Sequence, residues 1–199
     1  DQKLLGKLSK IWGVRSFNLA KMGFNEQYPF LYNLTARTNK DQPLTTPNDS
    51  LIKFNQKVSN KYKAGQGLSY LASYIGKDKV DSSIKTYYQF FKTQRTKTQD
   101  FESILKRSAD TNIDWFFDTY VSTDRKIDFK IQKVVKLEDS LQVTIKNKDE
   151  TNVPISLFGL KNDSVVSKYW FTGIDEIETF TIPKNDEEEL VLNYDQKIP

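Results

Sequence analysis

The stretch KYKAGQGLSYLASYIG (Lys61–Gly76) is the part of the sequence around which the rest of the chain is organised. Four apolar residues in it are spaced i, i+3, i+4 and i+7, so they share one face of a helix: Leu68, Leu71, Ala72 and Ile75. Gly76 follows directly, where a helix end favours a residue that can adopt positive φ. The pattern predicts a core helix with small residues for close packing. It also allows a second reading, in which this helix holds the hydroxyl of Tyr62 at an active site.

The composition excludes several kinds of catalytic and structural site. The chain has 199 residues, of which 37% are hydrophobic and 13% aromatic, so it can build a packed core in one large or two small domains. It contains no cysteine and no histidine. Disulfides, thiolate sites, histidine-based zinc sites and Ser-His-Asp triads are therefore excluded within this chain. Catalysis by this chain alone would have to use carboxylates, lysines or tyrosines.

The charge pattern gives no sign of a nucleic-acid partner. The net charge is +4, from 30 basic and 26 acidic residues that are interleaved along the chain. Nucleic-acid binding usually needs basic residues gathered in a patch or stripe, and the run Asp186–Glu189 is acidic instead. No apolar run reaches the roughly 18 residues of a membrane span. The chain starts without methionine and stops in a charged stretch, so we expect a fragment of a longer protein.

The region before the central helix is expected to be only partly regular. Asp1–Trp12 has its leucines on one face and its lysines on the other, which predicts an amphipathic helix. Tyr28–Tyr32 is expected to be an apolar patch on a proline turn. Thr38–Ser50 is polar and contains two prolines, which predicts a loop that is functional or wraps a surface. The central helix then covers about Asn55–Ile75.

Three more helices are predicted after it. Asp78–Thr93 has apolar residues at helical spacing, namely Val80, Ile84, Tyr87, Tyr88 and Phe91. Thr98 is the expected N-cap of the next helix, because Asp100 and Glu102 place negative charge in its first turn. Asn112–Tyr120 is rich in aromatic residues and predicts a final helix that fills the bundle with rings.

The period of the pattern changes to that of β-strands at about Thr123. Apolar and polar residues alternate around Phe129 and again around Val143, which indicates strands with one buried face. Further strands are expected at Val153–Leu160, Val165–Phe171, Ile177–Ile182 and Leu190–Tyr194, separated by turn residues. We therefore predict an α+β fold: a helical bundle subdomain over residues 1–125, and a small antiparallel β-sandwich of immunoglobulin or fibronectin type over residues 126–199.

Four motifs in this order carry a resemblance to a known family. Tyr62–Gly65 looks like a Tyr-x-x-Gly stretch, and Leu71–Gly76 follows it like a helix that ends in Leu-Gly. Thr98–Phe101 is similar to a Thr-x-x-Asp-Phe helix start, and Asp114–Phe117 to a Trp-containing helix before a β domain. Over residues 55–199 the chain resembles the C-terminal part of a zinc aminopeptidase of the M1 (gluzincin) family, in the form found in large bacterial envelope homologues. The chain departs from the family at Ala64, because the family commonly has lysine directly before the glycine. In this chain the lysine, Lys63, lies one residue earlier.

The resemblance implies an activity, although not for this chain alone. In the family, zinc is held by His-Glu-x-x-His and a downstream glutamate, so the metal site would lie N-terminal to Asp1. The partners would be that zinc-binding half of the same polypeptide and a peptide substrate, in the bacterial envelope or periplasm. The chain itself would bind no zinc at an active site and cleave no peptide. Tyr62 would donate a hydrogen bond to the tetrahedral oxyanion, a contribution typically worth ~2.7–4 kcal/mol.

Two other functions are consistent with the sequence. In one, the parent protein has lost catalysis and this part is a binding or scaffolding module that contacts a partner through Thr38–Ser50 or the sandwich edges. In the other, the chain is a carboxylate-based hydrolase that uses Asp110, Asp114 and Asp118, which lie four residues apart. Nothing in the sequence complements these three carboxylates. A His-Glu-x-x-His motif and a later glutamate just upstream of Asp1 would indicate the peptidase, and their absence would indicate the binding or scaffolding module.

Overall fold

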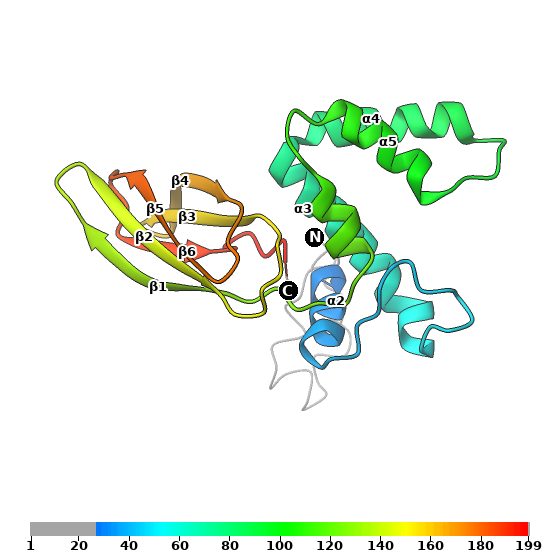
Figure 1. The fold of residues 1–199 in the computed structure, drawn as a ribbon, viewed down its shortest axis with the longest axis horizontal. Coiled ribbons are helices and arrows are strands. Elements are labelled where there is room, and N and C mark those ends of the chain that lie inside the picture. Colours follow the sequence, from blue (N-terminus) through cyan, green and yellow to red (C-terminus); the bar gives the residue numbers. More distant parts are fainter. Residues whose placement is uncertain (1–26, 199) are drawn as a thin grey trace, which may run out of the picture.

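The structure is a computed structural model that describes residues 27–198, and it places helices first and strands second (Figure 1). The helical elements are α2 (Gln27–Arg37), the π-helical turn η4 (Asn55–Ser59), α3 (Asn60–Ile75), α4 (Lys77–Phe91), α5 (Thr98–Ser108) and the π-helix η5 (Phe116–Val121). The strands are β1 (Phe129–Lys136), β2 (Ser140–Asn147), β3 (Ile155–Lys161), β4 (Ser164–Phe171), β5 (Ile177–Pro183) and β6 (Glu189–Leu192). The predicted α+β class is confirmed. The helix predicted at Asp1–Trp12 lies outside the described residues.

The central helix is present where the sequence predicts it, and its start is unusual. The Asn60 N–H donates to the Asn55 carbonyl, five residues back, so η4 winds more widely than the α-helix that continues from it. The helix ends at Gly76, whose φ of +103° confirms the predicted positive-φ position. Leu71 and Ile75 are buried as expected. The buried face is wider than predicted, because it also includes Lys63, Gly67 and Tyr70.

Two details of the other helices differ from the predictions. Tyr28–Tyr32 is part of α2 and does not form a proline turn. Pro29 is tolerated because it lies in the first turn, where its missing N–H has no intrahelical partner to lose. Thr98 is the first residue of α5 and not its N-cap. The N-cap is Lys97, whose backbone N–H donates to the Asp100 carboxylate at 2.7 Å.

The aromatic segment before the strands forms a helix that fills the core, as predicted. The buried side chains of η5 are Phe116, Phe117, Tyr120 and Val121. The rings of Phe116 and Tyr120 are nearly parallel, with centroids 5.7 Å apart. The Tyr120 ring also meets those of Tyr70 and Tyr32 edge-on, at 6.1 and 6.3 Å. These rings join α2, α3 and η5 into one core.

The six strands form two antiparallel sheets of three strands, in the orders β1-β2-β5 and β4-β3-β6. In β2, every second residue is buried, which confirms the predicted alternation around Val143. Strand β3 is buried along nearly its whole length because it is the middle strand of its sheet. The rings of Phe171 in β4 and Phe180 in β5 stack at 4.2 Å and so join the two sheets.

The segments next to β3 and β6 contact the middle of α3. The Tyr70 hydroxyl donates to the Pro154 carbonyl. Nearby, Lys197 Nζ donates to Ser69 Oγ at 3.1 Å, and Gln66 Nε2 donates to the Gln196 carbonyl at 2.7 Å. Figure 1 shows the sheets as one group beside the helices. The division into two domains at residue 125 stays a prediction.

Candidate functional site

Tyr62 is the third residue of α3 and lies in its first turn. Its side chain is half-buried and packs against the hydrophobic core. The ammonium of Lys61 lies 5.1 Å from the centre of its ring. A tyrosine in this position has its ring fixed by packing and its backbone fixed by the helix. The catalytic role of Tyr62 stays a prediction. Whether its hydroxyl is held in a fixed position depends on the residues that surround the first turn of α3.

A polar stripe runs along the buried face of η4 and the start of α3. It consists of Asn55, Ser59 and Lys63, spaced four residues apart, and these residues are only 0%, 0% and 1% exposed. Gly67 and Leu71 continue the same spacing further along the helix. Fully buried polar side chains are costly unless they are hydrogen-bonded. The contacts of the stripe are therefore part of what holds the N-terminal half of α3 in place.

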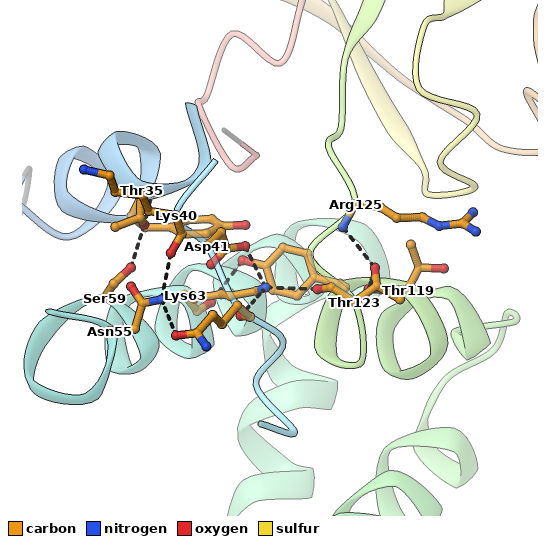
Figure 2. Close-up of polar contacts among 12 residues, drawn as sticks. Thr35, Lys40, Asp41, Asn55, Ser59, Lys63, Thr119, Thr123 and Arg125 are labelled. Atoms are coloured by element: carbon orange, nitrogen blue, oxygen red, sulfur yellow. Dashed lines mark hydrogen bonds and ion pairs between the residues drawn. The ribbon is translucent and has the colours of Figure 1, made fainter. Parts of the chain in front are cut away.

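Lys63 is the most demanding member of the stripe, because it brings a charge into the core. Its ammonium donates to Asp41 Oδ2 at 2.8 Å, to the Gln42 carbonyl at 3.0 Å and to the Thr123 carbonyl at 3.1 Å (Figure 2). An ammonium has three N–H donors, so all three are used. The Lys63 and Asp41 side chains are 2% and 10% exposed, which makes this a buried ion pair.

The other two members of the stripe bind the segments that flank this ion pair (Figure 2). Asn55 Nδ2 donates to the Lys40 carbonyl at 2.8 Å and to Gln42 Oε1 at 2.9 Å. Ser59 Oγ and Thr35 Oγ1, on α2, are 2.7 Å apart. The segment Thr38–Ser50 contains no helix or strand, so the predicted loop is confirmed. Through Asp41 and Gln42, this loop wraps the start of α3.

Asp41 has an environment that opposes its charge. Burial raises the pKa of its carboxyl above the usual 3.8, although the nearby Lys63 ammonium acts in the opposite direction. Its second oxygen, Oδ1, is buried and accepts no hydrogen bond from the described residues. Beside it lies a pocket of about 330 Å³ whose wall carries charges of both signs, from Arg37, Asp41, Asp124, Arg125, Lys126 and Asp128.

Tyr120 holds the same turn of α3 from the other side. Its hydroxyl donates to the Lys63 carbonyl at 3.0 Å, and burial raises its pKa well above the usual 10.0, which keeps it a neutral donor. Its ring lies directly against Gly67. A Cβ at that position would be 2.3 Å from Cε1 of the ring, a separation that real side chains do not reach. Gly67 is therefore required here for the close approach of η5 to α3.

The three aspartates of the carboxylate hypothesis do not form a joint site. Asp110 precedes the final helix and pairs with Lys79. Asp114 binds Lys106 at 2.6 Å, and this contact lowers the pKa of its carboxyl. Asp118 is exposed. The first two carboxylates are thus engaged with separate surface lysines, which gives no support to a hydrolase built on them.

The described residues do not fit a metal site. Within residues 27–198, no group of three His, Cys, Asp or Glu residues lies close enough together to hold a metal ion. The zinc that the resemblance implies would therefore need ligands from outside this part of the chain. Over the same residues, no helix has the length and apolar character needed to cross a membrane.

The polar stripe is the part of this site that periodicity alone does not find. Hydrophobic spacing identifies Leu71 and Ile75 but is silent about a buried lysine. The signal that was available is the four-residue spacing of Lys63, Gly67, Leu71 and Ile75, which puts Lys63 on the core-facing side. A lysine there needs an anionic partner. Asp41 lies 22 residues away in an irregular loop, and no local pattern names it.

Comparison with known proteins gives a likeness in structure but none in sequence. No family model matches the chain, and no curated protein matches it in sequence. Among solved structures, it is similar to the crystal structure of aminopeptidase A from Legionella pneumophila in complex with aspartic acid, with a TM-score of 0.51 and 12% sequence identity. The match covers 70% of this chain and 17% of that one. The chain therefore has the fold of a small part of an aminopeptidase.

Proposed function

We propose that this chain is the C-terminal part of an M1-family zinc aminopeptidase. The observation that carries the proposal is the structural likeness to part of an aminopeptidase, at a TM-score of 0.51, combined with the Tyr-x-x-Gly stretch at the start of α3. The zinc site then belongs to the preceding part of the same polypeptide, and the substrate is a peptide. Localisation in the bacterial envelope is part of the same proposal.

Within this proposal, Tyr62 is the catalytic residue of this chain. A phenol is a neutral hydrogen-bond donor at pH 7, which suits an oxygen that gains negative charge during attack on a peptide carbonyl. The helical turn that carries Tyr62 is held by buried contacts on two sides, so its donor is positioned before the substrate arrives. Preorganised donors of this kind are effective because they need no reorganisation during the reaction.

The proposal is tested on the full-length polypeptide that contains this chain. We expect hydrolysis of aminoacyl p-nitroanilides, loss of that activity with a chelator, and recovery when zinc is added back. We also expect His-Glu-x-x-His in the upstream sequence, with a glutamate about 18–20 residues later. If the motif is missing and no aminopeptidase substrate is cleaved, the peptidase proposal is wrong. The alternative, a non-catalytic binding or scaffolding module, predicts that outcome.

A further inference from the structure

The contacts around the start of α3 converge on the residue next to Tyr62. We propose that Lys63, through its buried ion pair with Asp41, is a positioning residue that fixes the helical turn carrying Tyr62. The catalytic consequence of this inference rests on the proposed function. The effect on the turn itself does not, because it concerns only the geometry of this chain.

The side chain of Lys63 is held by two segments that are distant in sequence. Asp41 and Gln42 belong to the loop between α2 and η4, and Thr123 belongs to the connection from η5 to β1. Each of the three N–H donors of the ammonium thus has an acceptor. Lys63 thus joins the loop, the central helix and the start of the sheets at one point.

The backbone of Lys63 is held as well. Its carbonyl accepts the Tyr120 hydroxyl at 3.0 Å, while the Tyr120 ring packs on Gly67 one turn later. Tyr62 and Lys63 are neighbours, with Cα atoms ~3.8 Å apart across one rigid peptide unit. A displacement of Lys63 therefore moves Tyr62 directly.

Small displacements matter for a catalytic donor. A group that stabilises a transition state has to be held within about 0.5 Å of its productive position. A misplacement of about 1 Å can lower a rate by roughly 100-fold. If the ion pair only stabilised the fold, its removal would loosen the whole structure evenly. If it positions Tyr62, its removal loosens the first turn of α3 more than the rest.

The test compares local and global motion in the full-length polypeptide. The main variant is Lys63→Met/Asp41→Leu, which removes both charges and leaves no uncompensated buried charge. Asp41→Asn is the second variant if the double variant does not fold, because it keeps the shape of the side chain and an acceptor for Lys63 while it removes only the charge of Asp41. The matched control is Lys148→Met, which breaks the Lys148–Asp128 pair, whose side chains are 45% and 47% exposed.

Amide hydrogen exchange is measured for a peptide covering residues 60–67 and for one covering β2, which reports global opening. We expect exchange at 60–67 to rise by about tenfold or more relative to β2 in the double variant, and the control to match the wild type. Equal acceleration of both peptides overturns the inference, because it shows a purely structural role.

Kinetics provide the second reading. We expect the double variant to lower kcat by about 10–100-fold with little change in KM, and to cause no further loss when Tyr62 is already phenylalanine. If Tyr62→Phe alone leaves kcat unchanged, the proposed role of Tyr62 fails, and the exchange measurement still decides the role of Lys63. If the variant lowers kcat equally with and without the Tyr62 hydroxyl, Lys63 does not act through Tyr62 and the inference fails.

Discussion

Gly67→Ala is the substitution that tests the packing of the central helix most sharply. The new Cβ would lie 2.3 Å from Cε1 and 3.0 Å from Cδ1 of Tyr120. The Tyr120 ring cannot easily withdraw, because its hydroxyl binds the Lys63 carbonyl and its face stacks on Phe116. The methyl group therefore has to push η5 away from α3 or force the ring from its preferred rotamer.

The magnitude follows from two opposing contributions. Overpacking of a tight core typically costs about 1–3 kcal/mol, while replacing a helical glycine by alanine gains about 1 kcal/mol. The matched control is Gly65→Ala, two residues earlier in α3, where a Cβ would have no atom within 4 Å. The helix-propensity gain is common to both substitutions. The difference between them is therefore the steric cost alone, and we expect Gly67→Ala to be about 1–3 kcal/mol less stable than Gly65→Ala.

The assay is urea unfolding followed by circular dichroism, with the free energy of unfolding extrapolated to water for both variants. Gly65→Ala should be as stable as the wild type or more stable. A Gly67→Ala variant that is as stable as Gly65→Ala would refute the close contact between Tyr120 and α3.

Three further predictions concern the buried polar groups. Lys63→Met should lower the free energy of unfolding by about 3–5 kcal/mol, because it leaves the Asp41 carboxylate without its counter-charge. The double variant Lys63→Met/Asp41→Leu should restore most of that loss. A Lys63→Met variant as stable as the wild type would contradict this prediction. The carboxyl of Asp41 should titrate above its usual pKa of 3.8 in NMR spectra. The stability that this carboxyl contributes is then complete below pH about 4 and is lost as the pH rises through the pKa of the folded state. If the wild type and an Asp41→Asn variant show the same pH dependence of stability, the pKa shift is absent. Tyr70→Phe should cost about 1–3 kcal/mol, because the buried Pro154 carbonyl loses the hydroxyl that binds it, and unchanged thermal stability would show that another donor replaces it.

The regular part of this fold is readable from the sequence because it depends on local periodicity. The helix face with Leu71 and Ile75, the turn at Gly76 and the alternation in β2 are each set by residues within one element. The turn residues then separate one predicted strand from the next. These features establish the α+β class without any knowledge of long-range contacts.

The candidate site is less readable because its contacts join distant segments. Lys63 finds Asp41 across 22 residues and Thr123 across 60 residues. Such pairings depend on how the loop wraps the helix, and no short-range pattern encodes them. The π-helical turn η4 is also missed, and its first residue, Asn55, donates to the Lys40 carbonyl in the loop. Tyr62 itself is found only through the resemblance to a family.

Steady-state kinetics of Tyr62→Phe in the full-length polypeptide decide whether the Tyr62 hydroxyl takes part in catalysis. Tyr88→Phe is the matched control, because this tyrosine lies on α4 with 66% of its surface exposed. We predict that Tyr62→Phe lowers kcat by about 100–1000-fold, the usual loss for one oxyanion donor, with KM nearly unchanged, while the control keeps wild-type kinetics. A Tyr62→Phe variant with the kcat of the wild type would contradict the catalytic role of this residue.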